Sequence, residues 1–369
     1  MIPVNRPVLD GNEQRYLAEC IETGWISSEG PFVKKLETKF SQLMGCRHGV
    51  AVCNGSLAID LALAALQIGP GDEVILPSFT IISCAAAVVR AGAVPVVVDC
   101  TADTWNIDPT LIAAKINGRT KAIMPVHIYG LPVDMDPILE IARQHNLFVV
   151  EDAAEQHGQT YKGRPVGSLG DIATVSFYSN KHVTTGEGGM VVTNEAELAE
   201  RCRRLRNLSF DAERRYIHEE FGWNLRMSNL QAAVGVAQLE RIDESLRKKR
   251  QIGAWYQDHF RGHALLQLPL QRTSYAENIY WIFGVVLDDR VPFDAREAIA
   301  RLRANGVDAR HFFWPMHEQP VLRKLGFFAG ECCPVAERIA RRGFFLPSGI
   351  GTTRNEVDKS AETLKEVLA

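Results

Sequence analysis

The feature that most constrains this chain is an alternation, starting near residue 48, of short runs rich in β-branched residues with longer stretches of helical periodicity. This rhythm is typical of βαβ units and of a mostly parallel sheet. Some runs are continuously apolar, as at Val96–Val98, which indicates strands covered by helices on both faces. The predicted strands are His48–Cys53, Glu73–Leu76, Val94–Asp99, Lys121–Val126, Phe148–Asp152, Thr174–Phe177 and Gly189–Thr193. The predicted helices are Ser56–Leu66, Ile81–Ala91, Pro109–Ile116 and Met135–His145.

The pattern changes after the last of these strands. A charged, arginine-rich segment runs from Glu195 to Glu220, and one long helix is predicted from Ser228 to about Arg250. At 369 residues the chain exceeds the usual size of a single domain. We predict a large domain over residues 1–245, which includes the N-terminal segment, and a small α+β domain over residues 246–369. The small domain is predicted from the patterns at Tyr280–Leu287, Ala295–Asn305, Val307–Phe313 and Glu356–Leu368.

Composition argues against several classes of partner. The 41 Lys and Arg residues nearly balance the 44 Asp and Glu residues, and a net charge of −3 gives no general field for nucleic acid or an acidic membrane. No stretch approaches the roughly 20 apolar residues of a membrane span, and the N-terminus lacks an apolar leader, so we expect a cytoplasmic protein. The eight cysteines form no C-x-x-C pair, and we expect free thiols and no metal site.

A first candidate site is the turn Asn54-Gly55-Ser56, which closes a predicted strand and opens a helix. Free backbone N–H groups and the positive end of the helix dipole meet at such a turn, and glycine lets a phosphate approach closely. The same residues also fit a plain turn in which Ser56 is the helix N-cap. The turn alone leaves both interpretations open.

A second candidate is the apolar strand Phe148–Asp152, which ends abruptly in two carboxylates. Parallel sheets bind ligands at the carboxyl ends of their strands. A buried Asp152 needs a cationic partner or must be protonated, and a protonated heterocyclic nitrogen is a suitable partner. The alternative is that Asp152 caps the next helix.

A third candidate is Lys181, which follows an apolar and aromatic strand containing Ser176 and precedes a glycine-rich turn at Gly186–Gly189. In a largely apolar pocket the pKa of a lysine falls, and its neutral amine can attack a carbonyl carbon to form a Schiff base. The alternatives are a solvated surface lysine and glycines that only make a hairpin turn.

The three candidates together are more specific than any one of them. A helix start that suits a phosphate, an Asp at a strand end and, about thirty residues later, a Ser-x-x-x-x-Lys follow the order of fold-type-I pyridoxal-phosphate enzymes. Over almost its entire length the chain resembles the DegT/DnrJ/EryC1/StrS family of sugar aminotransferases. The segments that carry the resemblance include Trp25–Ser28, Gly71–Val74, Pro77–Thr80, Pro125–Gly130, Glu151–Glu155, Gly167–Asp171, Gly186–Gly189 and Gly222–Ala233.

The resemblance implies an α/β transferase of fold type I that binds pyridoxal 5'-phosphate. Lys181 would hold the cofactor as a Schiff base and carry a proton between cofactor and substrate. Asp152 would pair with the pyridinium nitrogen and keep the ring an electron sink. Glu155 falls where the family places a side chain near the phenolic oxygen of the cofactor, and a carboxylate facing an oxygen needs a shared proton.

The resemblance also assigns the phosphate site and the assembly. Gly55, Ser56 and Ser176 would bind the cofactor phosphate, and Asn224 would reach the same phosphate from the neighbouring subunit. The expected assembly is therefore a homodimer with shared active sites. Asn224 also fits a cap or turn within its own chain, which leaves its role open.

On the substrate side, Arg310 and His317 match the segment of the small domain that closes over a nucleotide sugar. The stretches Asn180–Lys181, Thr184–Met190 and Pro315–His317 most resemble members that aminate GDP-4-keto-6-deoxymannose at C4, with L-glutamate as amino donor. We therefore predict a nucleotide-sugar aminotransferase of this kind, in a pathway to lipopolysaccharide O-antigen sugars. The alternatives are a dTDP- or UDP-linked ketosugar, amination at C3, and a non-catalytic nucleotide-sugar-binding protein of the same fold.

Two positions bear on these alternatives. Family members commonly carry an aromatic residue that stacks on the cofactor ring where this chain has Ile81, so either Ile81 or Phe79 must cover the ring. Relatives that catalyse 3-dehydration have His in place of the lysine. Here His182 is one residue late and Lys181 is in register, which counts against a dehydratase.

Overall fold

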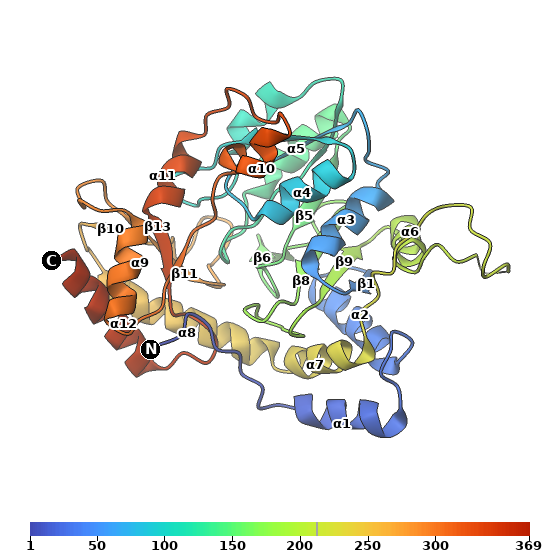
Figure 1. The fold of residues 1–369 in the computed structure, drawn as a ribbon, viewed down its shortest axis with the longest axis horizontal. Helices are drawn as coiled ribbons and strands as arrows, with labels where there is room; N and C mark the ends of the chain where they lie inside the picture. The colour runs from blue at the N-terminus through green and yellow to red at the C-terminus, as the bar shows by residue number, and fades with distance from the viewer. Residues whose placement is uncertain (212) are drawn as a thin grey trace.

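A seven-stranded sheet forms the centre of the molecule (Figure 1). The computed structural model describes residues 1–211 and 213–369. The strand order is β1-β9-β8-β5-β4-β2-β3, and all neighbours are parallel except that β9 is antiparallel to both β1 and β8. The predicted, mostly parallel sheet is therefore confirmed. Its strands are β1 (His48–Val52), β2 (Glu73–Pro77), β3 (Val94–Val98), β4 (Thr120–Ile123), β5 (Phe148–Asp152), β8 (Ile172–Ser176) and β9 (Gly189–Thr193).

Helices cover both faces of this sheet. Val50 and Val52 pack in one apolar cluster with α3 and α4, whereas Ala51 between them packs in a second cluster with α2 and α7. Alternate side chains of a strand point to opposite faces, so continuously apolar runs are required here. No helix of the described ranges is long and apolar enough to cross a membrane. The helices of this part are α1 (Glu13–Thr23), α2 (Pro31–Leu43), α3 (Gly55–Ala65), α4 (Ile82–Arg90), α5 (Met135–His145), α6 (Ala196–Arg206) and α7 (Asn229–Leu239).

The C-terminal part has its own antiparallel sheet, in the order β10-β11-β13-β12, and a separate apolar cluster. The predicted boundary at residue 245 falls inside α8 and remains a proposal. The N-terminal residues also contact this part, because Ile2 pairs with Val307 and the Val4 carbonyl accepts the N–H of Ser348. Its elements are α8 (Ile242–Phe260), β10 (Leu266–Gln267), β11 (Phe283–Leu287), α9 (Ala295–Ala304), β12 (Arg310–His311), α10 (Pro320–Lys324), α11 (Pro334–Arg342), β13 (Gly343–Leu346) and α12 (Arg354–Leu368).

Two of the helix predictions were wrong. The expected single helix from 228 to 250 is broken between α7 and α8, where Arg241 leaves the helical region with φ −117° and ψ 16°. The carboxylate of Glu240 there accepts hydrogen bonds from Asn12 and Tyr16 of the N-terminal segment, contacts that local sequence does not reveal. The predicted helix Pro109–Ile116 is two short 3-10 turns.

Candidate active site

A cavity of about 910 Å³ opens at the carboxyl ends of the parallel strands, where Asp152 ends β5 and Ser176 ends β8. This edge is where parallel sheets bind ligands. The structure brings most of the predicted site residues together around it, and leaves Asn224 and His317 outside. The predicted residues that line the cavity are Gly55, Ser56, Asp152, Glu155, Ser176, Lys181 and Arg310.

The turn at the start of α3 has backbone N–H groups that no acceptor of the described ranges satisfies. Asn54 is the helix N-cap, since its Oδ1 accepts the N–H of Leu57 at 3.0 Å, so the interpretation of Ser56 as the cap is wrong. The first N–H groups of a helix lack partners within it, and no residue of the described ranges accepts those of Gly55 and Ser56. A Cβ on Gly55 would lie 2.6 Å from the Cβ of Ser176. This turn can therefore receive an anion, and it requires glycine.

Asp152 is a buried carboxylate, 4% exposed. Its Oδ1 accepts the N–H of Ala154 at 3.0 Å and its Oδ2 accepts the thiol of Cys84 at 3.2 Å. The chain continues into turns and short strands and the next helix is α6, so the helix-cap interpretation is wrong. Within the described ranges no Lys or Arg forms an ion pair with Asp152. Because an unpaired buried carboxylate is costly, the position suits a cationic ligand atom.

Lys181 lies in the connection between β8 and β9, which pair as a long hairpin that the glycines help to close. Its side chain is 9% exposed, so the interpretation as a solvated lysine is wrong. The Nζ atom lies 3.5 Å from Oε1 of Glu155 and 3.7 Å from the centre of the Trp281 ring. Burial lowers the pKa of Lys181, and the charge of Glu155 opposes that change. A lowered pKa favours the neutral, nucleophilic amine.

Glu155 sits between this amine and the peptide of Tyr129. Its Oε2 accepts the Tyr129 N–H at 2.6 Å. Burial raises the pKa of Glu155 to about 7, against the influence of Lys181. Near neutral pH this carboxyl group is therefore partly protonated and can share a proton with an oxygen atom in the cavity. That state is the one required of a carboxylate facing a phenolic oxygen.

The remaining predicted residues have different surroundings. Arg310 of β12 is exposed in the cavity wall. His317 is 1% exposed, and its ring nitrogens contact Ser78 Oγ at 2.7 Å and Glu337 Oε1 at 3.0 Å. Asn224 is exposed, and its Oδ1 accepts a hydrogen bond from Nε of Arg226 at 2.8 Å. Only Arg310 of these three faces the cavity of its own chain.

Ile81 and Phe79 are the two residues predicted to cover the cavity. Ile81 lines it and is 42% exposed, whereas Phe79 is fully buried against Tyr129 and other rings, so Ile81 is the one that faces the cavity. Trp281 was not among the predicted site residues, because it lies in the range Tyr280–Leu287, which was assigned as a whole to the small α+β domain. The other aromatic residues that line the cavity are Tyr129, Tyr178, Trp223, Phe313 and Phe345.

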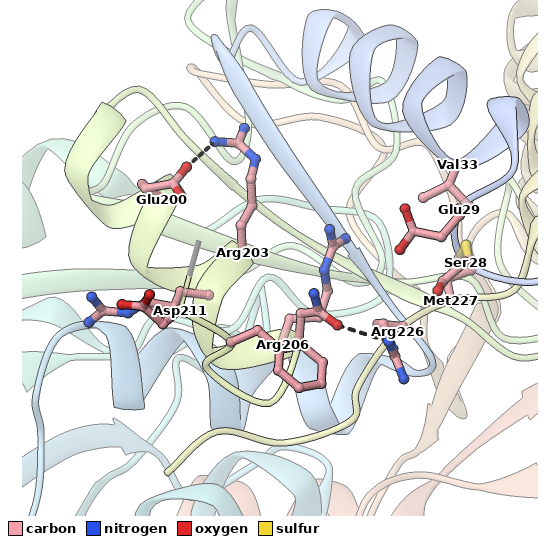
Figure 2. A pocket seen from close by; sticks show the side chains of 12 residues that line it. Ser28, Glu29, Val33, Glu200, Arg203, Arg206, Asp211, Arg226 and Met227 are labelled. Carbon is pink, nitrogen blue, oxygen red and sulfur yellow. Dashed lines mark hydrogen bonds and ion pairs between the residues drawn. The ribbon is translucent and has the colours of Figure 1, made fainter. Parts of the chain in front are cut away.

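A second cavity, of about 540 Å³, lies beside α6 and the segment that leads to α7 (Figure 2). Figure 2 shows Arg203 beside Glu200. Arg203 Nη1 donates to Glu200 Oε2 at 3.4 Å, and Arg226 Nη1 donates to Asn207 Oδ1 at 2.9 Å. None of the predicted site residues lines it. We therefore place the candidate active site in the larger cavity. The arginines that line the second cavity are Arg203, Arg204, Arg206 and Arg226.

Comparisons with known proteins agree with this geometry. The solved structure of Spr1654 from Streptococcus pneumoniae in its PLP form superposes with a TM-score of 0.93 at 26% identity, covering 99% of this chain and 98% of that one. The model of the DegT/DnrJ/EryC1/StrS aminotransferase family matches residues 7–365, and the chain belongs to this family. The predicted α/β fold of pyridoxal-phosphate-dependent aminotransferases and the predicted cofactor, pyridoxal 5'-phosphate, are confirmed.

Curated relatives are similar over nearly the whole chain. GDP-perosamine synthase of Caulobacter vibrioides is 44% identical over 369 residues, which are 100% of this chain and 98% of the relative. GDP-perosamine synthase of Vibrio cholerae is 37% identical, covering 99% and 98%. A UDP-N-acetyl-3-dehydro-alpha-D-glucosamine 3-aminotransferase of Acidithiobacillus ferrooxidans is 38% identical, covering 91% and 88%.

The residues present fit pyridoxal 5'-phosphate. The free N–H groups at Gly55 and Ser56 suit its phosphate, and the unpaired, buried Asp152 suits its protonated ring nitrogen. Lys181 offers an amine of lowered pKa to its aldehyde, and Glu155 offers a carboxyl group that can share a proton with its phenolic oxygen. All four features line one cavity.

Proposed function

We propose that this enzyme transfers the amino group of L-glutamate to C4 of a nucleotide-linked 4-keto-6-deoxyhexose, with GDP-4-keto-6-deoxymannose as its substrate. The observation that carries the proposal is the 44% identity over the whole chain to a GDP-perosamine synthase. The relative that acts on a UDP-linked sugar is less similar and covers less of the chain. The 4-amino sugar would serve the assembly of lipopolysaccharide O-antigens in the cytoplasm.

The bound cofactor would supply an electron sink for removing and replacing the proton on the substrate carbon. Lys181, with its lowered pKa, would hold the cofactor, and its Nζ would move this proton. Asp152 keeps the ring nitrogen protonated through its buried charge. Glu155 would share a proton with the phenolic oxygen of the cofactor, which its pKa of about 7 permits.

Five further residues orient the ligands. The N–H groups of Gly55 and Ser56, together with the Ser176 hydroxyl, bind the cofactor phosphate at the start of α3. Arg310 contacts the negative charge of the nucleotide sugar from the opposite wall. His317 acts indirectly, because its ring anchors the Pro315–Gln319 segment to the end of β2 through Ser78.

Purified protein loaded with pyridoxal 5'-phosphate tests the proposal. Glutamate should collapse the visible absorbance band of the cofactor, and a nucleotide ketosugar should restore it. Product analysis across GDP-, dTDP- and UDP-linked ketosugars should show amination at C4 with preference for GDP-4-keto-6-deoxymannose. Preference for a dTDP or UDP sugar, or amination at C3, would overturn the substrate assignment. If glutamate leaves the absorbance band of the cofactor unchanged, the result would favour a non-catalytic binding protein.

We also propose a homodimer in which Asn224 serves the site of the partner. The arm at residues 213–223 extends from the body between α6 and α7 (Figure 1) and carries exposed apolar side chains. Large exposed apolar groups are typical of a surface that another protein covers. Asn224 follows directly and lies outside the cavity of its own chain. The exposed fractions are 94% for Phe221, 79% for Tyr216 and 54% for Ile217.

Subunit mixing tests the shared site. Lys181→Ala and Asn224→Ala homodimers should each be impaired, whereas a hybrid dimer contains one site with both defects and one with neither. Activity should therefore reappear when the two variants exchange subunits. If Asn224 serves its own chain, every hybrid site carries one defect, and mixing recovers nothing beyond the average of the parents.

A further inference from the structure

The amine of Lys181 lies over the face of the Trp281 ring. The Nζ atom lies 3.7 Å from the ring centre, close enough for a cation–π contact with an ammonium group. The indole N–H donates to the carbonyl of Asn180 at 3.0 Å, which ties the ring to the residue that precedes Lys181. Trp281 is 6% exposed and lines the cavity. The lysine thus lies between an aromatic face and the carboxylate of Glu155.

A second buried lysine holds the backbone of this tryptophan. Lys249 of α8 is 3% exposed, and its Nζ donates to the carbonyl of Trp281 at 2.6 Å and to that of Ser348. Burial lowers the pKa of Lys249 to about 7. Either protonation state keeps the two N–H groups that the two carbonyls require.

The segment that Lys249 holds is conformationally strained. Tyr280, directly before Trp281, has a φ of 50°, in the left-handed region that a tyrosine rarely adopts. Its N–H donates to Asn278 Oδ1 at 2.7 Å, and its ring lies on α8 where a Cβ on Gly253 would come within 2.6 Å of Cε2. Lys249 and Gly253 are one helical turn apart, so α8 fixes this segment at two points. Strain held in this way beside a reactive group points to function.

We propose that Trp281 is a further catalytic residue that holds the Lys181 amine through its ring face, and that Lys249 is a positioning residue that acts through Trp281. The proposal rests on the proposed function, in which Lys181 is the reactive amine. When the amine is not bonded to the cofactor it has a defined place between Trp281 and Glu155. The ring face stabilises the ammonium form, while burial favours the neutral amine that accepts a proton.

Competitive acetylation of Lys181 tests this without measuring turnover. The full-length protein, in its pyridoxamine-phosphate form and again without cofactor, is treated with acetic anhydride across a range of pH, and labelling is read by peptide mass spectrometry. Glu155 and Asp152 are the charged groups that act on Lys181, and both remain in every variant. Trp281→Leu should make Lys181 about three- to ten-fold more reactive where it is mostly protonated, and should shift its profile to lower pH.

The variants of Lys249 test the second step. Lys249→Met should shift the profile in the same direction, and should add nothing in a Trp281→Leu background, because both act on one contact. Lys248→Met removes a neighbouring amine that contacts Trp255 instead, and should leave the profile unchanged. If Lys249→Met does not fold, Lys249→Gln, which keeps donors, should give a smaller shift. If neither folds, Lys249 is structural and its assignment fails.

Other outcomes overturn the proposal. An equal rise in labelling at every pH would report easier access to Lys181 and no stabilised ammonium. An unchanged profile in Trp281→Leu would show that the ring does not stabilise the Lys181 ammonium group. An unchanged profile in Lys249→Met would show that Lys249 does not position Trp281. If the profiles shift as expected while no ketosugar is aminated, the proposed function fails and the lysine contact stands.

Discussion

The two walls of the cavity are built by different means. The sheet wall consists of Gly55, Asp152, Ser176 and Lys181. Gly55 begins α3, Asp152 ends β5, Ser176 ends β8, and Lys181 lies in the connection from β8 to β9. The C-terminal wall, to which Trp281, Arg310, Phe313 and Phe345 belong, comes from β12, β13 and the segments beside them. The first wall therefore depends on local backbone geometry, and the second depends on how a separate unit packs against it.

This difference separates two kinds of binding. Strand ends and a helix start present carboxylates and N–H groups in fixed positions, as a cofactor used in every turnover requires. The C-terminal wall offers the exposed guanidinium group of Arg310 beside the half-buried rings of Phe313 and Phe345, which suit a substrate that must enter and leave. Substitutions in the sheet wall should therefore affect the chemical step. Substitutions in the C-terminal wall should affect substrate binding, except at Trp281, whose ring contacts the Lys181 amine.

The largest effect is expected for Lys181→Ala in the sheet wall. The variant loses both the amine that binds the cofactor and the group that moves the proton, so kcat should fall by about four orders of magnitude or more. The fold should be intact, and equilibrium dialysis should still detect cofactor that is held through its phosphate. Steady-state rates with saturating glutamate and ketosugar provide the measurement. Near-native rates would show that another residue is the catalytic lysine.

Asp152→Asn keeps the shape of the same wall and removes its charge. The ring nitrogen would lose the buried carboxylate that keeps it protonated, and we expect kcat to fall by roughly two orders of magnitude or more. Cofactor affinity should drop as well, which a spectral titration measures. Activity within a few-fold of the native enzyme would show that the buried Asp152 has only a structural role.

Gly55→Ala tests the close approach of α3 to β8. The added Cβ would lie 2.6 Å from the Cβ of Ser176, so the phosphate turn must move. We expect the Kd for pyridoxal 5'-phosphate to rise at least about ten-fold, since a charge-assisted hydrogen bond contributes about 1.5–3 kcal/mol. Gly118→Ala is the matched control, because a Cβ there meets nothing within 4 Å. Equal affinities for the two variants would exclude Gly55 from the phosphate site.

The same contrast explains what the sequence could predict. The β5 strand was predicted with its observed bounds, and Asp152 was correctly expected at a ligand-binding edge, because period, strand ends and turn residues are local properties. The break between α7 and α8 was not predictable, because Glu240 is held by Asn12 and Tyr16, more than 220 residues away in sequence. Trp281 was missed for a related reason, since only tertiary packing places its ring on Lys181.

His317 shows the limit of transferring a role along a sequence, and it provides the smallest expected effect. Its buried ring contacts Ser78 and Glu337 and does not line the cavity, whereas Arg310 is exposed in the cavity wall. Arg310→Met should raise KM for the nucleotide sugar about ten-fold, with kcat within a few-fold, as loss of a charged contact does. His317→Gln should instead lower the free energy of unfolding by about 1–3 kcal/mol and change KM less. Urea unfolding and steady-state kinetics on both variants measure the difference, and a KM increase for His317→Gln equal to that for Arg310→Met, with unchanged stability, would place His317 in contact with the substrate.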